Sequence, residues 1–244
     1  MIRVNNREDR DHWVTCLNDA AQLRVEDLWD YDMTHEFGRG RYAAVYPAKR
    51  KTAKYFQNDE RLVAEGEKLD KTTLLKRCDC ALKIVDKNQF WRRVIKGRER
   101  ADTLVREPSV QATLTAKCGK IPTFLQIKGF FETADNVVLE LELLEGTDLF
   151  NYLSSKGVLS ESEAALIMRD VLTSLDAMNR VGLAHRDIKP ANILMCNKET
   201  SGVSVKVGDF GMSTFVGVDG LVRGRCGTFL DRVTTVLMFD RAAH

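Results

Sequence analysis

The clearest signal in this chain of 244 residues comes from residues 184–194, which read Ala184-His185-Arg186-Asp187-Ile188-Lys189-Pro190-Ala191-Asn192-Ile193-Leu194. An Asp, a Lys and an Asn stand here close together among apolar neighbours. A second Asp, at position 209, follows an apolar alternation over residues 203–207 that predicts a strand. Because phosphoryl transfer depends mostly on positioning and charge neutralisation, one carboxylate could orient a hydroxyl nucleophile and the Lys could hold the phosphate. The Asn and the second Asp offer oxygen ligands of the kind that Mg²⁺ prefers.

The same residues, followed by Asp209-Phe210-Gly211, resemble the catalytic loop and the metal-binding motif of eukaryotic protein kinases. The resemblance implies that Asp187 is the catalytic base and that Lys189 contacts the transferred phosphate, as in serine/threonine kinases. It also implies that Asn192 and Asp209 hold Mg²⁺ beside ATP. The alternative is a turn capped by Asp and Asn, which the full pattern disfavours.

Composition and charge exclude few classes of protein. The chain is 44% hydrophobic and 30% charged, and its formal net charge of +2 gives no indication of nucleic-acid binding. No apolar run approaches the length of a membrane-spanning helix, and residues 1–8 lack the apolar region of a signal peptide. We therefore expect a cytoplasmic protein, with the nucleus or the membrane periphery as alternatives. In such a compartment the six cysteines do not predict disulfides, and Cys78 and Cys80 lack the spacing of a zinc site.

Residues 7–23 predict an amphipathic helix that carries one tryptophan, Trp13. Together with residues 2–4, this segment is similar to the end of a pleckstrin homology domain. On that interpretation residues 1–26 are the remnant of such a domain, and contact with membrane lipid would require a missing upstream part. The alternative is a helix that packs on whatever follows it.

Residues 28–46 predict a hairpin around a glycine-rich turn. Glycine lets the backbone approach phosphate groups closely, and the backbone amides supply hydrogen-bond donors. The kinase nucleotide-binding pattern is met at Gly38, Gly40 and Val45, with Ala43 in place of its third glycine. Because Pro47 cannot donate a hydrogen bond to a neighbouring strand, its strand is predicted to be an edge.

Residues 49–77 form an insertion relative to the kinase pattern. The segment is polar and shows no sustained apolar period. We expect a long solvated loop with a short helix near residues 60–67. A docking site is the alternative.

Residues 80–85 predict an apolar strand that carries one charged side chain, Lys83, which requires a partner. By resemblance, Ala81 and Lys83 contact ATP, and Glu107 is the helix residue that pairs with Lys83. Pro108 follows Glu107 directly, and the residue before a proline avoids helical geometry. Either the helix kinks there or Pro108 begins a new one.

Residues 124–131 and 136–144 predict two further strands. In the kinase pattern, Leu141 takes the gatekeeper position, and Glu142 and Leu144 belong to the hinge that binds adenine through backbone groups. Asp148 takes the acidic position that meets the ribose hydroxyls, and Leu194 is expected to contact ATP.

Residues 160–180 predict the clearest helix, with Ser160 and Glu163 as a capping box. The residues predicted to form its buried stripe are Ala164, Ile167, Met168, Val171, Leu172, Leu175 and Met178. Residues 87–106 are strongly basic, which predicts a solvated helix face, or alternatively a docking surface for an acidic partner or anionic lipid.

The segment after Asp209 follows the kinase pattern up to Thr228 and then departs from it. Residues 215–227 contain no Ser, Thr or Tyr, so Ser213, Thr214 and Thr228 are the nearest candidates for phosphorylation. Residues 229–244 match nothing in the family.

These observations predict an α+β, protein-kinase-like fold with a complete β-rich N-lobe and an incomplete helical C-lobe. The kinase domain would span residues 27–228, with an N-lobe at 27–143 and a partial C-lobe at 144–228, and is most similar to calcium/calmodulin-dependent-type and protein kinase D-like kinases. The predicted function is transfer of the γ-phosphate of ATP to a Ser or Thr hydroxyl of a protein substrate. The alternative is an inactive nucleotide-binding or scaffold fragment, with MgATP binding but no transfer by the isolated chain.

Overall fold

The computed structural model describes residues 22–51, 62, 70–119, 121, 123–196 and 202–222. Most of the predicted helix at residues 7–23, most of the short helix at 60–67, Thr228 and the tail at 229–244 lie outside these residues. The chain divides into two compact units, one from Met1–Lys96 and Gly129–Glu140 and the other from Gly97–Lys128 and Leu141–His244. No helix within the described ranges has both the length and the apolar character that crossing a bilayer demands.

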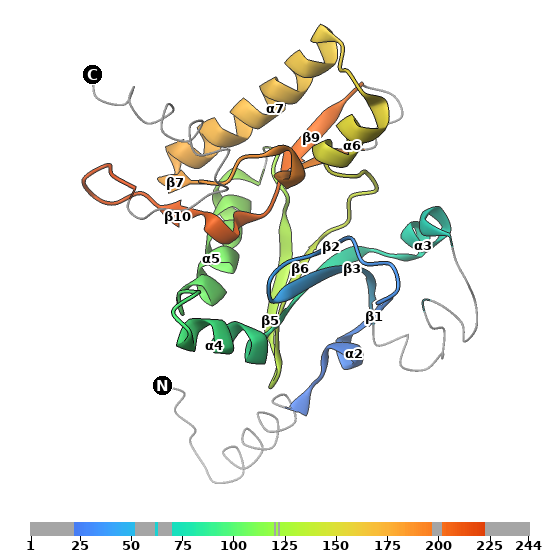
Figure 1. The fold of residues 1–244 in the computed structure, drawn as a ribbon, viewed down its shortest axis with the longest axis vertical. Coiled ribbons are helices and arrows are strands. Elements are labelled where there is room, and N and C mark those ends of the chain that lie inside the picture. The colour runs from blue at the N-terminus through green and yellow to red at the C-terminus, as the bar shows by residue number, and fades with distance from the viewer. Residues whose placement is uncertain are drawn as a thin grey trace, which may run out of the picture. The chain divides into compact units, whose positions relative to one another are not determined.

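The first unit is built on a sheet whose strands follow the order β1-β3-β4-β6-β5, with β2 also paired to β3 (Figure 1). Strands β1, β2 and β4 all run antiparallel to β3. The bounds are Trp29–Tyr31 for β1, Gly38–Arg39 for β2, Ala43–Arg50 for β3, Cys80–Asp86 for β4, Ile127–Glu132 for β5 and Asn136–Glu142 for β6. The predicted hairpin is therefore present, with its first strand in two parts.

One face of this sheet carries the core of the first unit. Trp29, Cys80 and Leu82 are buried there together with Val25 of the short helix α2 (Val25–Leu28). The ring of Phe131 meets Trp29 edge to face, with 4.8 Å between the ring centroids. Cys80 thus begins the strand predicted at residues 80–85 and is buried in this core.

The prediction that Pro47 marks an edge strand was wrong, because β3 lies between β1 and β4. On its β1 side, β3 pairs with β1 through residues 48–50 and with β2 through residues 44 and 45. Pro47 falls in the gap between these pairings, where its carbonyl accepts a hydrogen bond from the Asp32 amide at 3.4 Å. The missing N–H group is therefore not required by any neighbouring strand at this position.

The insertion is not simply a solvated loop. Residues 71–77 form a helix, α3 (Lys71–Arg77), whose amides at Thr72 and Thr73 are capped by the Asp70 carboxylate. Leu74 and Leu75 of this helix are buried, and so is Leu62 of the insertion. The sequence signals for this helix are one capping residue and two adjacent leucines. They are too few to produce a sustained apolar period, so the helix was not predicted.

The basic segment begins with helix α4 (Lys87–Ile95). The Lys87 ammonium forms an ion pair with Glu132 at 2.7 Å and donates to the Thr133 carbonyl at 2.7 Å. Further along, the guanidinium of Arg100 pairs with Asp102 at 3.0 Å. Part of the basic charge is therefore neutralised within the chain.

The second unit contains three helices and two pairs of short strands among the described residues. Its helices are α5 (Thr103–Cys118), α6 (Leu149–Lys156) and α7 (Glu161–Arg180). The strands β8 (Ile193–Cys196) and β9 (Ser204–Val207) pair antiparallel, as do β7 (Leu183–Ala184) and β10 (Thr214–Phe215). Two 3-10 turns, η1 (Pro190–Asn192) and η2 (Phe210–Met212), contain the predicted functional motifs. Helix α7 lies along β9 (Figure 1).

Helix α7 has the predicted start but a narrower buried stripe. The Ser160 hydroxyl accepts from the Glu163 amide at 3.3 Å, and the Glu163 carboxylate accepts from the Ser160 amide at 3.1 Å, so the capping box is confirmed. Ile167, Val171 and Met178 are buried as predicted. Met168 and Leu172, however, are 51% and 47% exposed. They lie beside the face that packs on β9, so their predicted burial was wrong for the described part of the chain.

We expect Leu172→Gln to change the free energy of unfolding by less than about 0.5 kcal/mol, because the side chain loses little buried contact. The substitution should also reduce concentration-dependent light scattering, since it interrupts an exposed apolar pair. The matched control is Ile167→Ala on the buried face, which should cost about 2–5 kcal/mol in urea unfolding. Equal destabilisation by the two substitutions would contradict the exposed position of Leu172.

Candidate active site

The loop between β7 and β8 brings three predicted site residues together. The Asp187 carboxylate is buried, and its Oδ2 accepts hydrogen bonds from Lys189 Nζ at 2.8 Å and from Asn192 Nδ2 at 3.1 Å. Asn192 Nδ2 also donates to the Asp187 carbonyl at 2.8 Å. Turn η1 starts at Pro190, whose fixed φ suits the first position of a helical turn, and this turn carries Asn192 back toward Asp187. An oriented carboxylate beside an ammonium group is the result.

Asp209 is attached to the same loop through the residue that precedes it. The Gly208 amide donates to the Asn192 carbonyl at 2.8 Å. Strand β9 ends at Val207, and Asp209 then adopts the left-handed region with φ 54°. Asp tolerates this conformation better than most residues, yet it is rarely occupied and tends to occur at functional sites. The backbone therefore turns sharply where the predicted metal-binding carboxylate stands.

His185 lies under this arrangement and was not assigned a role from the sequence. Its Nε2 donates to the Gly208 carbonyl at 3.0 Å, and its Nδ1 accepts from the Asp187 amide at 3.3 Å, which fits a neutral ring. Burial lowers the pKa of His185 below its ordinary value of 6.5, against the opposing effects of the Gly208 carbonyl and nearby carboxylates. The neutral imidazole thus ties the Asp187 backbone to the residue before Asp209.

The lowered pKa of His185 predicts a loss of stability in mild acid. Below about pH 6.5 the unfolded chain binds a proton at this ring that the folded chain does not, so the free energy of unfolding falls as pH falls. We expect His185→Gln, which keeps a donor for the Gly208 carbonyl, to flatten this dependence by up to about 1.4 kcal/mol per pH unit. Urea unfolding between pH 5 and 7.5 measures it. Parallel curves for the two proteins would show that His185 does not control the dependence.

Arg186 and Ser213 fix the start of the segment that follows Asp209. Arg186 has φ 69°, and its Nε donates to the Met212 carbonyl at 2.7 Å. The Ser213 hydroxyl is buried and donates to the His185 carbonyl at 3.2 Å. Ser213 is therefore not accessible for phosphorylation in this conformation, whereas Thr214 is partly exposed.

Helix α5 continues through Pro108, so the alternative that this proline begins a new helix was wrong. A proline inside a helix removes one backbone hydrogen bond, and Pro108 is itself buried within α5. Glu107 Oε2 and Asp209 Oδ1 lie 3.6 and 3.4 Å from the position that a Cβ on Gly211 would take. The structure thus places the Glu107 carboxylate beside the Asp-Phe-Gly motif within the second unit.

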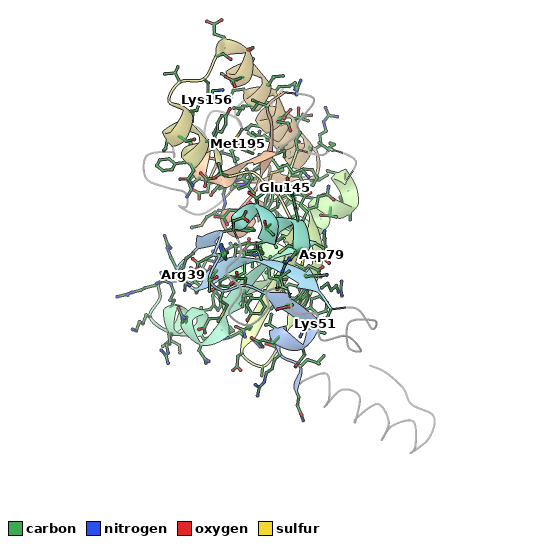
Figure 2. All side chains as sticks on the ribbon, turned by 90° about the vertical axis from the view of Figure 1, so that its right-hand side faces the viewer. Arg39, Lys51, Asp79, Glu145, Lys156 and Met195 are labelled. Carbon is green, nitrogen blue, oxygen red and sulfur yellow. The ribbon has the colours of Figure 1, made fainter. Side chains whose placement is uncertain are left out.

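Asp148, the predicted ribose residue, lies against β8. Asp148 and Leu194 form an isolated antiparallel bridge. In the chain, Gly146 lies between the predicted hinge and Asp148. It leaves no room for a side chain, because a Cβ there would lie 2.0 Å from the Met195 carbonyl oxygen. Figure 2 labels Met195 and Glu145, the neighbour of Gly146, on the two segments. The Asp148 carboxylate caps α6 by accepting from the Asn151 amide at 2.9 Å.

In the first unit, four predicted nucleotide-binding residues line up across three strands. Gly38 is in register with Val45, and Val45 is in register with Lys83. Ala81 stands two residues before Lys83, and partners in register share a sheet face, so Val45, Ala81 and Lys83 lie on one face. The amide of Gly40 donates to the Ala43 carbonyl at 2.7 Å and closes the glycine-rich turn.

The donor set of the second unit fits a magnesium ion bound with phosphate groups. Asn192 uses its amide nitrogen on Asp187, which leaves its Oδ1 as the ligand atom, and Asp209 supplies a carboxylate. Among the described residues no three His, Cys, Asp or Glu side chains form a ready-made metal cluster. Mg²⁺ at nucleotide sites commonly takes one or two protein carboxylates and completes its shell with phosphate oxygens and water. Asn192 and Asp209 match that pattern.

Two residues of this region had no role predicted from the sequence. Gly146 is required by its close approach to Met195, and Lys206 forms an ion pair with Glu142 across 64 positions of the chain. The signals available in the sequence were a glycine next to an acidic residue and a lysine in an apolar strand. Neither identifies its partner, because both contacts are distant in sequence.

Comparisons with known proteins agree with the resemblance found in the sequence. The family model described as protein kinase domain matches residues 66–230. A probable myosin light chain kinase of Dictyostelium discoideum is 28% identical over 218 residues, covering 89% of this chain and 52% of the relative. A calcium/calmodulin-dependent protein kinase type 1 of Macrobrachium nipponense is 32% identical over 148 residues, covering 61% and 39%. A serine/threonine-protein kinase of Saccharomyces cerevisiae is 32% identical over 107 residues, covering 44% and 13%. The chain spans about half the length of the first relative and less of the other two.

Proposed function

The chain belongs to the protein kinase family, and we propose that it transfers the γ-phosphate of ATP to a Ser or Thr hydroxyl of a protein substrate. One observation carries the proposal: Lys189 Nζ and Asn192 Nδ2 both donate to the same oxygen of a buried Asp187 carboxylate. The catalytic loop is therefore assembled within its own unit. The relatives named above are all kinases, which does not favour the alternative of an inactive fragment.

In this proposal Asp187 orients the substrate hydroxyl and accepts its proton as the phosphorus–oxygen bond forms. Lys189 compensates negative charge on the transferred phosphate while its ammonium group stays hydrogen-bonded to Asp187. Asn192 and Asp209 would hold Mg²⁺, which neutralises charge on the phosphates when bound. His185 keeps these groups in place through the Gly208 carbonyl.

We assign the remaining nucleotide contacts as follows. Glu142 and Leu144 bind adenine through backbone groups, Asp148 meets the ribose, and Leu194 contacts the base. In the first unit, Lys83 binds the phosphates. Glu107 belongs to the second unit, and the kinase pattern alone assigns it as the ion-pair partner of Lys83. The shared sheet face of Val45, Ala81 and Lys83 and the register of Gly38 support the other assignments in the first unit, which are Gly38, Gly40, Val45 and Ala81.

Serine and threonine are the proposed acceptors because a lysine stands two residues after Asp187, the pattern of serine/threonine kinases, and because the yeast relative has that name. The likeness to a calcium/calmodulin-dependent kinase supports placement in that group. ATP and a protein are the proposed partners, with no role for nucleic acid. We place the activity in the cytoplasm, with the nucleus and the membrane periphery as further locations.

The test is a paired assay on the 244-residue chain. Thermal shift with MgATP reports binding, and transfer of labelled phosphate to Ser/Thr and Tyr peptide libraries reports catalysis. We expect stabilisation by MgATP and label on Ser or Thr. Stabilisation without any labelled peptide would instead support the inactive fragment, and label confined to Tyr would contradict the proposed acceptor.

A further inference from the structure

Lys206 is a charged residue in an otherwise apolar strand. Its neighbours Val205 and Val207 in β9 are buried, and the Lys206 side chain is only 14% exposed. In the β8–β9 pair, Lys206 is in register with Leu194, so the two side chains share a sheet face. Lys206 therefore projects from the face of the β8–β9 pair that also carries Leu194, the residue assigned to the adenine base.

Both carboxylate oxygens of Glu142 accept a hydrogen bond from the Lys206 ammonium group. Lys206 Nζ lies 2.7 Å from Oε1 and 2.6 Å from Oε2 of Glu142. Oε1 also accepts from the Gln126 amide at 2.8 Å, and the Glu142 amide donates to the Gln126 carbonyl at 3.0 Å. Residue 142 is thus fixed through both its backbone and its side chain. All three residues belong to the second unit.

The Lys206 and Glu142 side chains are only 14% and 20% exposed, and an ion pair so shielded from water is a poor source of stability, because desolvation of both charges offsets much of their attraction. It is an effective geometric constraint, since two oxygens and an ammonium group define one arrangement. The constraint acts on the backbone that follows Glu142, which the proposed function assigns to adenine. The ion pair also connects that backbone to strand β9, which ends at Val207, shortly before Asp209.

We propose that Lys206 is a positioning residue for nucleotide binding, which holds the adenine-binding backbone of residues 142–144 through its ion pair with Glu142. The inference rests on the proposed function, because it assumes that this backbone binds adenine. Lys206 itself does not contact the reacting atoms. Its removal should therefore weaken the affinity for the base and leave the phosphate contacts unchanged.

The test is isothermal titration of the 244-residue chain with adenosine and with MgADP, for the unsubstituted protein and for Lys206→Met. We expect both dissociation constants to rise by the same factor, about tenfold, because the loss lies at the adenine end that both ligands share. In a peptide phosphorylation assay the KM for ATP should rise while kcat changes little.

Three further variants separate positioning from a general loss of structure. Lys206→Arg keeps a bidentate partner for the carboxylate and should hold the adenosine affinity within about twofold of the unsubstituted chain. The exchange Glu142→Lys with Lys206→Glu should recover part of the affinity that either change alone removes. The matched control is Arg180→Met, which breaks the exposed 2.7 Å pair with Asp176 in the same unit and should leave both affinities unchanged.

Unchanged adenosine affinity in folded Lys206→Met would overturn the inference, as would a loss confined to MgADP. A chain that binds nucleotide but phosphorylates no peptide would contradict the proposed reaction and leave the positioning role supported by the titrations. A folded, unsubstituted chain that binds neither ligand would overturn both.

Discussion

Asp187→Asn is expected to abolish phosphotransfer and to leave nucleotide affinity unchanged. The substitution keeps the shape of the side chain, and its remaining oxygen can still accept from Lys189, so the loop should stay assembled. An amide cannot take the proton of the substrate hydroxyl. Loss of such a general base typically costs on the order of 10²–10⁴ in rate.

The measurement is single-turnover transfer of labelled phosphate to the best Ser/Thr peptide, together with titration of MgADP. Asp176→Asn is the matched control, because it removes one carboxylate from an exposed ion pair on α7 in the same unit. It should leave rate and affinity unchanged. Retention of more than a tenth of the rate in Asp187→Asn would remove Asp187 from its assigned role.

The sequence could predict that Asp187 meets Lys189 and Asn192, because these residues are neighbours in the chain. All three lie between positions 187 and 192, so their short spacing alone allows them to meet. The same holds for the capping box of Ser160 and Glu163, which depends on a separation of three residues. Local rules suffice wherever the partners are local.

Features that depend on distant partners could not be predicted in this way. The register of β3 against two separate strands explains Pro47, and packing in the first unit explains α3 with its buried Leu74 and Leu75. Helix α5 shows that tertiary contacts can override the preference of the residue before Pro108. Met168 shows a different limit of the sequence. Apolar periodicity indicates which face of a helix is apolar, but it does not show whether another element covers that face, and Met168 is exposed.

Gly146→Ala is expected to destabilise the second unit strongly. A Cβ at this position would lie 2.0 Å from the Met195 carbonyl oxygen and 2.7 Å from the carbonyl carbon, and both are backbone atoms. The two segments cannot separate easily, because the Met195 amide donates to the Thr147 carbonyl at 2.7 Å. Overpacking of this kind typically costs about 1–3 kcal/mol, and the upper end applies where no flexible side chain can yield.

For a chain of this size, a loss of about 3 kcal/mol in the free energy of unfolding lowers the melting temperature by roughly 6–12 °C, which differential scanning calorimetry can measure. Gly38→Ala is the matched control, because a Cβ on Gly38 would meet nothing within 4 Å and its φ is not in the left-handed region. Its melting temperature should stay within about 2 °C of the unsubstituted chain. If the backbone near residue 146 moves aside to admit the methyl group, Met195 and the paired Leu194 must move with it, so adenosine affinity should fall together with stability. An unchanged melting temperature and unchanged adenosine affinity in Gly146→Ala would show that the close approach to Met195 does not constrain this segment.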